Sequence, residues 1–183
     1  MRLFVGIPLA DKVGSEVAAV VAQLRRGAAA DELRWAAPES WHITLQFLGN
    51  AGAEQFERVK ARLGEVHSAP VPVRLGALGA FERAGIVYVD VDPGPELSAL
   101  QQQVTAATSQ CGFAPEERAF HPHITLARAK GRRRFRGVPA PRSWRESPPQ
   151  FTPFESREFL LYESFTGESG SRYEVQARFP LAS

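Results

Sequence analysis

The sequence predicts an α+β fold built from two similar halves that pack about a pseudo-twofold axis. The tetrapeptide His-Ile-Thr-Leu occurs twice, at residues 42–45 and 123–126. An apolar segment of strand type and a helical pattern precede each copy, and Phe4 lies 38 residues before His42 while Val87 lies 36 residues before His123. An internal duplication explains this shared order. Neither half has enough elements to bury both faces of a sheet alone, so we expect the halves to pack together.

In the first half, the order of elements is strand, helix, strand, helix. Residues 3–7 form an apolar run typical of a strand, and valine and leucine then recur at helical spacing through 13–24. Residues 41–48 are predicted as the second strand, and 56–66 have the periodicity of a helix. A further strand is expected over 73–78.

The second half repeats a strand and a helix before its own motif strand. Residues 86–91 are β-branched, and Pro95 suits the first turn of a helix that follows. The segment 131–149 is rich in basic residues and proline, which is typical of a loop. The expected elements are a strand at 86–91, a helix at 95–111, a strand at 123–129 and a hairpin of 158–165 with 173–179.

Length and composition indicate an ordinary globular protein. The chain has 183 residues, of which 44% are hydrophobic and 23% charged, so we expect one domain over 1–183. Cys111 is the single cysteine, which excludes an internal disulfide and favours a reducing, cytoplasmic location. No apolar run approaches the roughly 18 residues needed to cross a bilayer. We expect a monomer that does not insert into membranes.

Positive charge is concentrated in one stretch of the chain. The net charge is only +2, yet residues 128–145 hold eight basic side chains and no acidic one. Such asymmetry is typical of a protein that draws a polyanion toward one face. It makes nucleic acid a candidate partner, whereas a solvated basic loop without any partner is the alternative.

The duplicated motif suggests paired acid and base catalysis. Side chains alternate along a strand, so isoleucine and leucine point to one face while histidine and threonine point to the other. His42 and His123 would then line a shared cleft, together with Thr44 and Thr125. One imidazole can remove a proton from a nucleophile while the other protonates a leaving group, and no metal or cofactor is needed. The two hydroxyls can donate hydrogen bonds to negatively charged oxygens.

A phosphodiester suits this arrangement better than a carbonyl compound. Displacement at phosphorus places the attacking and leaving groups on opposite sides, with donors around the remaining oxygens. No serine or cysteine elbow motif lies near the histidines in the sequence, so water or a substrate hydroxyl is the expected nucleophile.

The motifs and their surroundings resemble the 2H phosphoesterase superfamily. Within it, RLFVGI at 2–7, HITLQFLG at 42–49 and FHPHITLAR at 120–128 are similar to bacterial and archaeal RNA 2′,3′-cyclic phosphodiesterases, formerly called 2′-5′ RNA ligases. This resemblance implies two antiparallel β-sheet lobes with outer helices and a central cleft. It also implies hydrolysis of an RNA 2′,3′-cyclic phosphate end to a 2′-phosphomonoester.

The resemblance assigns roles that a nearly symmetric site cannot assign by itself. It implies that His42 is the proton donor, that His123 is the proton acceptor, and that Thr44 and Thr125 contact the phosphate. Arg128 also matches the family motif, although strict alternation places it with Ile124 and Leu126, away from the cleft, unless a bulge intervenes. The partner would be RNA with a cyclic phosphate end, or a cyclic nucleotide.

Further substrate contacts are expected near the second motif. His121 is a candidate for the rim of the site, and Arg132, Arg133 and Arg134 are candidates for RNA phosphates. His121, His123 and His42 have the alternative of binding zinc, but no carboxylate or cysteine is placed to complete such a site. The alternative functions are 2′-5′ RNA ligation, action on a small cyclic phosphate, and RNA binding without catalysis.

Overall fold

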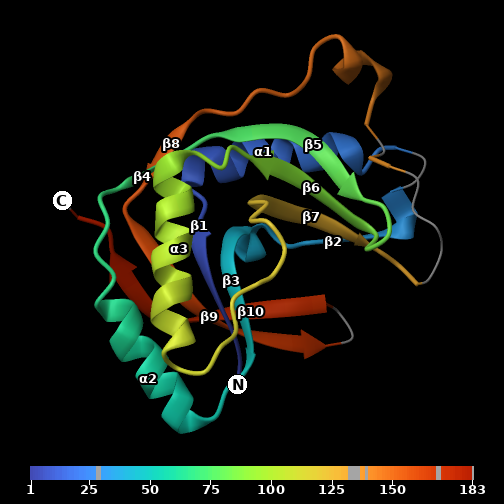
Figure 1. Ribbon diagram of the computed structural model, residues 1–183. Helices are drawn as coiled ribbons and strands as arrows, with labels where there is room; N and C mark the ends of the chain where they lie inside the picture. The colour runs from blue at the N-terminus through green and yellow to red at the C-terminus, as the bar shows by residue number, and fades with distance from the viewer. Residues whose placement is uncertain (28–29, 132–136, 139, 168–169, 183) are drawn as a thin grey trace.

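The fold is a mixed α+β architecture, as the duplicated pattern predicts (Figure 1). The computed structural model describes residues 1–27, 30–131, 137–138, 140–167 and 170–182. Within these residues the helices are α1 (Asp11–Leu24), α2 (Ala53–Gly64) and α3 (Pro95–Ser109). The strands are β1 (Arg2–Pro8), β2 (Leu33–Trp35), β3 (His42–Asn50), β4 (Val71–Val73), β5 (Leu75–Phe81), β6 (Ile86–Val91), β7 (His123–Ala129), β8 (Phe154–Ser156), β9 (Glu158–Gly167) and β10 (Gly170–Pro180).

The main sheet contains both halves of the duplication. Its strand order is β10-β9-β1-β3-β7-β6-β5, with β2 also paired to β7, and each pairing is antiparallel. Strand β1 beside β3 corresponds to β6 beside β7, with α1 and α3 as the intervening helices. The two expected lobes are thus two ends of one continuous sheet, while β4 and β8 form a separate two-stranded sheet.

The lobes meet where the two motif strands pair. Strand β3 runs antiparallel to β7, and the register places Ile43 opposite Ile124. These are the second residues of the two His-Ile-Thr-Leu motifs, so equivalent residues face each other across the junction. This pairing agrees with a twofold axis that passes between the two isoleucines.

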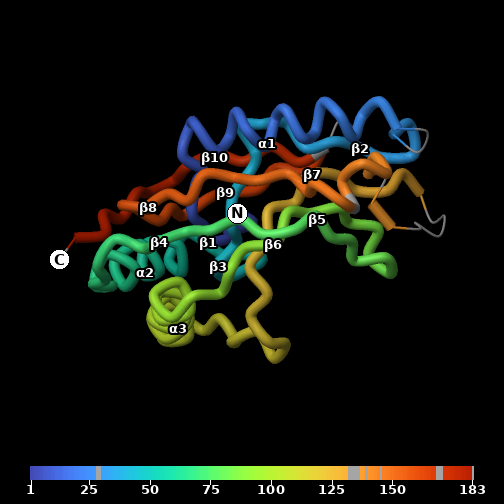
Figure 2. The backbone as a smooth tube through the Cα atoms, turned by 90° about the horizontal axis from the view of Figure 1, so that it is seen from above, coloured from blue at the N-terminus to red at the C-terminus, as the bar shows by residue number. Residues whose placement is uncertain are grey.

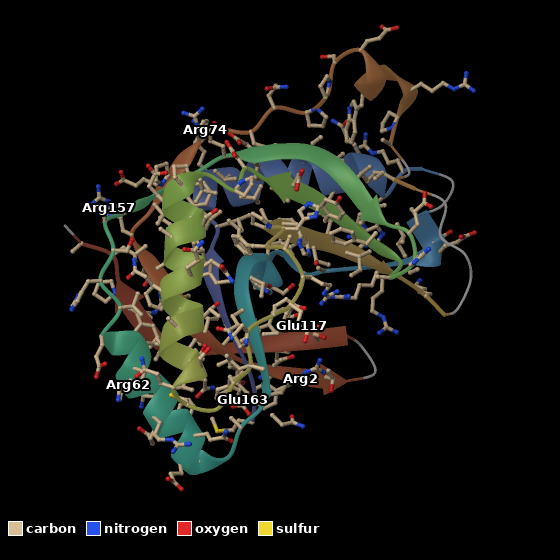
Figure 3. All side chains as sticks on the ribbon, in the orientation of Figure 1. Arg2, Arg62, Arg74, Glu117, Arg157 and Glu163 are labelled. Carbon is tan, nitrogen blue, oxygen red and sulfur yellow. The ribbon has the colours of Figure 1, made fainter. Side chains whose placement is uncertain are left out.

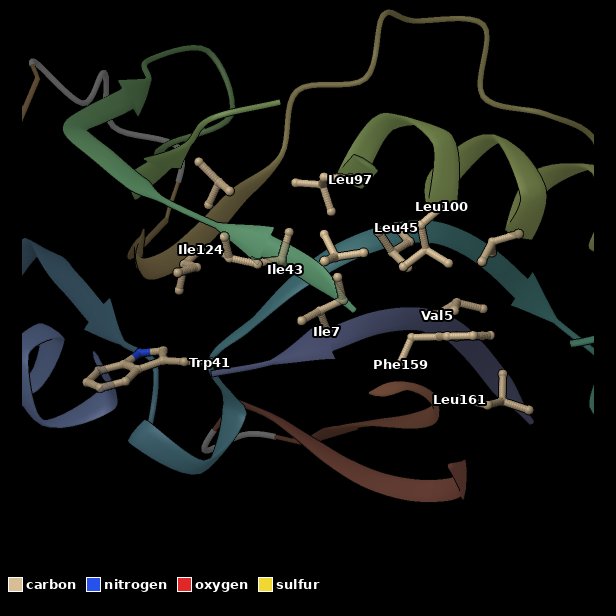
Figure 4. Close-up of a cluster of buried hydrophobic side chains, with 14 of the residues drawn as sticks. Val5, Ile7, Trp41, Ile43, Leu45, Leu97, Leu100, Ile124, Phe159 and Leu161 are labelled. Atoms are coloured by element: carbon tan, nitrogen blue, oxygen red, sulfur yellow. The ribbon is translucent and has the colours of Figure 1, made fainter. Parts of the chain in front are cut away.

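The core lies on the face to which the motif isoleucines and leucines point. Ile43, Leu45, Ile124 and Leu126 are buried in one cluster that includes apolar residues from all three helices. Figure 4 shows Leu97 and Leu100 of α3 beside Ile43 and Leu45 in this cluster. Seen from above, α1 lies along one side of the molecule while α2 and α3 lie along the other (Figure 2).

Both motif strands contain a β-bulge at the same position. In lobe 1, Val5 pairs with Gln46 and Gly6 with Thr44, so Leu45 is the extra residue. In lobe 2, Val87 pairs with Ala127 and Tyr88 with Thr125, so Leu126 is the extra residue. A bulge interrupts the alternation of side chains, and the residues beyond it exchange faces. The burial of consecutive positions 45–46 and 126–127 agrees with this geometry.

One expectation about local structure needs correction, and two short strands were not predicted. The strand expected over 73–78 is two strands in different sheets, because β4 ends at Val73 and pairs with β8 while β5 begins at Leu75 and pairs with β6. Strands β2 and β8 were not predicted, since three residues are too few to show a periodic pattern. The expected loop over 131–149 contains a 3₁₀ turn at Arg142–Arg145. The β9–β10 hairpin is confirmed, although residues 168–169 of its turn lie outside the described residues.

No helix in the described part of the chain is long and apolar enough to cross a membrane.

Shortening the isoleucine side chains at the junction of the two lobes should destabilise the whole fold. Ile43 and Ile124 are fully buried, and Ile→Ala changes in cores cost about 2–5 kcal/mol. We therefore expect Ile43→Ala and Ile124→Ala each to lower the free energy of unfolding by an amount in that range, measured by urea denaturation. The double variant should lose less than the sum, because the two side chains share one site. Additive losses would show that the two positions do not interact.

Candidate active site

His42 begins β3, and the backbone two residues earlier holds its ring. Its Nδ1–H donates a hydrogen bond to the Ser40 carbonyl oxygen at 2.7 Å. Because a carbonyl oxygen can only accept, the proton of the neutral ring lies on Nδ1. The Nε2 atom lies 3.1 Å from the Thr44 hydroxyl oxygen, which donates to it. His42 is thus fixed in orientation, with Nε2 as the atom that can exchange a proton.

His123 is held by the same contact at the start of β7. Its Nδ1–H donates to the His121 carbonyl oxygen at 2.8 Å. Ser40 and His121 both precede the motif histidine by two residues, so the duplication repeats the backbone contact as well as the side chains. The Nε2 atom of each ring is therefore the one that can exchange a proton with a substrate.

Aromatic rings surround His42. Its ring centroid lies 4.6 Å from that of Phe4, 5.1 Å from that of Tyr173 and 5.6 Å from that of Tyr162. Burial among these groups lowers the pKa of His42 to about 4, and the positive charges of His123 and Arg128 act in the same direction. The apolar surroundings make a protonated His42 a stronger acid than an ordinary imidazolium.

His123 has more polar surroundings. Burial lowers its pKa as well. The hydrogen bond to the His121 carbonyl opposes this shift, and the carboxylate of Asp90, which lies opposite His123 in the pairing of β6 with β7, opposes it to a smaller extent. The position opposite His42 in β1 is Pro8, which has no charge. Asp90 Oδ1 also accepts a hydrogen bond from His121 Nε2 at 2.8 Å. His121 thus lies at the exposed edge of the site and pairs with a carboxylate.

The motif threonines lie on the same face as the histidines. Thr44 and Thr125 are half-buried and alternate with the buried isoleucines and leucines, as the sequence predicts. In register, Thr44 lies opposite Gly6 and Thr125 lies opposite Tyr88. The ring of Tyr88 lies 5.4 Å from His123 and stacks on Phe81, which is 5.1 Å from His123.

The sequence places Arg128 away from the histidines only under strict alternation, with a bulge as the stated exception. The structure contains that bulge at Leu126, which returns position 128 to the histidine face. Arg128 is exposed and its charge lowers the pKa of both His42 and His123, which places it within electrostatic reach of both rings. In lobe 1 the equivalent position holds Phe47, which is 65% exposed.

Several residues near the site were not predicted from the sequence. One of them, Arg34, lies beside the site and makes no hydrogen bond to a motif histidine or threonine within the described residues. It lies in β2, directly opposite Arg128. Asp90, Phe4 and Tyr162 likewise reach the motifs through strand pairing, which no local pattern reveals. Conversely, the predicted RNA contacts Arg132, Arg133 and Arg134 lie outside the described residues.

Metal-binding side chains do not cluster in the residues that the structure describes: no group of three or more histidine, cysteine, aspartate or glutamate residues is placed to hold an ion.

Comparison with solved structures identifies the class of fold. A protein described as a phosphoesterase superposes with a TM-score of 0.81 at 25% identity, covering 100% of this chain and 98% of the other. The Escherichia coli LigT structure complexed with 3′-AMP superposes with a TM-score of 0.80 at 24% identity, with the same coverage. The fold and the paired His-x-Thr strands define a phosphoesterase of the 2H type.

Sequence comparison gives the family. The model of the 2′-5′ RNA ligase superfamily matches residues 13–157, and the chain belongs to this superfamily. A relative from Archaeoglobus fulgidus, named RNA 2′,3′-cyclic phosphodiesterase, is 30% identical over 177 residues, covering 95% of this chain and 97% of the relative. A Bacillus subtilis protein of the same name is 29% identical over 161 residues, covering 81% of each chain.

The two histidines should titrate below the usual range in the free protein. Burial destabilises the charged imidazole, so we expect His42 to titrate near pH 4 and His123 below pH 6.5. Proton NMR of the imidazole Cε1–H signals measures both, and the His42→Ala and His123→Ala variants assign the signals. Protonation of His42 persisting at pH 6 would contradict the aromatic burial described above.

Proposed function

We propose that this protein hydrolyses the 2′,3′-cyclic phosphate at an RNA end, or in a cyclic nucleotide, to a 2′-phosphomonoester. The observation that supports this most directly is the twofold arrangement of two Nε2 atoms, each on a ring fixed by a backbone carbonyl. Such rings can act on opposite sides of one phosphorus atom. The activity named for the relatives agrees with this chemistry.

The reaction needs one proton acceptor and one proton donor. In the proposed mechanism, His123 accepts a proton from water as the water oxygen bonds to phosphorus. The bond between phosphorus and the 3′ oxygen breaks, and His42 donates its proton to that oxygen, which becomes a hydroxyl. The Thr44 and Thr125 hydroxyls donate to the phosphate oxygens, with Arg128 balancing their negative charge. Water is consumed, and no covalent enzyme intermediate forms.

The unequal surroundings of the histidines favour this direction of transfer. After the step, His123 is a cation beside Asp90, and His42 is neutral among the aromatic rings. His42 then has the neutral form that its apolar surroundings favour, and Asp90 offsets part of the cost of charging the buried His123. Before the step, the negative charge of the bound phosphate favours a proton on His42.

Ligation is the second candidate, because it uses the same phosphorus centre. The superfamily takes its description from 2′-5′ RNA ligase activity, in which an RNA hydroxyl attacks in place of water. Hydrolysis and ligation would share both histidines, so their ratio depends on which nucleophile reaches the phosphate. A protein that binds RNA without turnover would retain the fold and lack both reactions.

Removal of either histidine should abolish most of the activity. We expect His42→Ala and His123→Ala each to lower turnover of a 2′,3′-cyclic mononucleotide by about 10²- to 10⁴-fold. The double variant should lose less than the product of the two factors, since the rings act in one step. Phosphorus NMR of the wild-type reaction identifies the product, and we expect the 2′-monoester.

The exposed His67 provides a matched control, and His67→Ala should retain wild-type turnover. Normal rates in either motif variant would refute the catalytic assignment. A 3′-monoester would show that the other phosphorus–oxygen bond breaks. EDTA should have no effect, and a loss of activity that zinc restores would instead support metal catalysis.

The dependence of kcat/KM on pH should reveal the effect of the Asp90 carboxylate on the pKa of His123. In the active form one of the two histidines is protonated and the other is neutral, so kcat/KM should be bell-shaped in pH. Because the pKa values of both rings are lowered, both limbs should lie below pH 6.5. Asp90→Asn removes the charge that raises the pKa of His123, so the alkaline limb should move to lower pH. The acidic limb, near pH 4, should stay.

Asp92→Asn is the control for this experiment, since Asp92 is an exposed carboxylate two residues away. It should leave both limbs in place. If Asp90→Asn lowered the rate equally at every pH, Asp90 would have only a structural role.

A further inference from the structure

The exposed face of the sheet carries two arginines side by side next to the histidines. The short strand β2 pairs with β7 so that Arg34 lies directly opposite Arg128, with Leu33 opposite Ala129 and Trp35 opposite Ala127. Leu33 and Ala127 are buried in a small apolar cluster, which also contacts Trp35 and Ala129. The neighbours of Arg34 in the strand therefore point inward, and Arg34 points to the outer face.

That outer face is the face of the active site. Ile86, Tyr88 and Asp90 alternate with buried valines in β6, and they pair with Arg128, Thr125 and His123 respectively. Directly paired residues in antiparallel strands lie on the same face. Arg34, Arg128, Thr125 and His123 therefore share one surface, although Arg34 comes from the other half of the duplication.

Two like charges directly opposite each other destabilise a sheet unless an anion lies between or beside them. Among the residues that the structure describes, no carboxylate forms an ion pair with Arg34 or with Arg128, although eight ion pairs are present elsewhere. Within that part of the chain the pair is thus a positive site without an ion-pair partner, on an exposed surface. Its planar guanidinium groups suit the oxygens of a phosphodiester.

The distance along the sheet indicates which phosphate this site can take. Because Leu126 is the extra residue of a bulge, Thr125 and Arg128 lie opposite Tyr88 and Ile86, which are two residues apart and so roughly 7 Å along the strand, and Arg34 lies roughly 5 Å to the side of Arg128 in β2. The terminal phosphate already has the two histidines, the two threonines and Arg128 around it in the proposed mechanism. Arg34 extends the positive charge beyond these groups.

We propose that Arg34, paired with Arg128 across β2 and β7, binds the internucleotide phosphodiester that precedes the terminal cyclic phosphate. This inference rests on the proposed function and specifies its substrate, because a cyclic mononucleotide has no such phosphate and an RNA chain has one. Arg34 is thus a specificity residue that distinguishes an RNA end from a free nucleotide.

The test compares Arg34→Ala with wild type on a cyclic mononucleotide and on a short RNA that ends in a 2′,3′-cyclic phosphate. Loss of a charged hydrogen bond should lower kcat/KM on the RNA by about 10-fold or more. Turnover of the mononucleotide should stay at the wild-type level. Arg34→Lys should recover part of the loss, since it keeps the charge without the two-pronged geometry. Arg74, an exposed arginine labelled in Figure 3, provides the control variant Arg74→Ala.

A dinucleotide with a cyclic end tests the contact directly. Replacing its single internucleotide phosphodiester by a neutral methylphosphonate should slow the wild type about as much as Arg34→Ala does. The same replacement should have little effect on the Arg34→Ala variant. The dependence of log kcat/KM on log salt for the RNA should also become shallower in Arg34→Ala, by about 0.7 for one lost phosphate contact.

The possible results separate this inference from the proposed function. If the wild type turned over neither substrate, the proposed function would fail. If the wild type were active and Arg34→Ala lost activity equally on both substrates, Arg34 would contact the terminal phosphate or support the fold, and the subsite would be refuted. Unchanged activity on both substrates, or equal effects of Arg74→Ala, would also refute it.

Discussion

The pairing of Ile43 with Ile124 is the constraint on which the rest of the site depends. It joins the two ends of the sheet at equivalent residues, so the histidine and threonine of each motif lie on one common face. A shift of one residue would turn the side chains of one strand to the opposite face, and the two imidazoles would be separated by the sheet. Burial of both isoleucines opposes such a shift, because it would expose one apolar set to water. Packing of the core thus determines how the motif histidines and threonines are placed relative to one another.

A symmetric frame supplies two equal histidines, and acid–base chemistry needs unequal ones. The difference comes from residues outside the motifs. Gly6 lies opposite Thr44 in the first lobe, whereas Tyr88 lies opposite Thr125 in the second. A Cβ atom on Gly6 would be 2.8 Å from the Ile43 carbonyl oxygen and 3.4 Å from Cδ2 of His42. Glycine therefore lets the His42 ring lie close to β1, where Phe4 and Tyr162 cover it. His123 is less deeply buried and lies beside Asp90, so burial lowers its pKa less than that of His42 and the second ring is the better base.

The sequence alone predicted the duplicated elements and the common face of the motif residues, because periodic burial and repeated residues are local signals. It did not predict the bulges at Leu45 and Leu126. A bulge depends on how a strand pairs with its neighbour, and the sequence of one strand does not record the register. The face of Arg128 therefore stayed conditional on a bulge that the sequence could not locate. Asp90 and Arg34 were missed for a related reason, since each reaches the site from a partner strand more than 30 residues away. The split between β4 and β5 likewise depends on two different partner strands.

The halves are also interlocked by contacts that cross between them. Strand β2 belongs to the first half but pairs with β7 of the second, and it brings Arg34 to the second motif. In the opposite direction, the bulge at Leu45 turns Gln46 into the core, where Thr108 of α3 donates a hydrogen bond of 2.6 Å to its Oε1 atom. A buried polar group without a partner is costly, so this contact ties the helix of the second half to the motif strand of the first. Displacement of either half would break contacts that orient the other, and the two histidines therefore hold their relative position through the whole fold and not through their own strands alone.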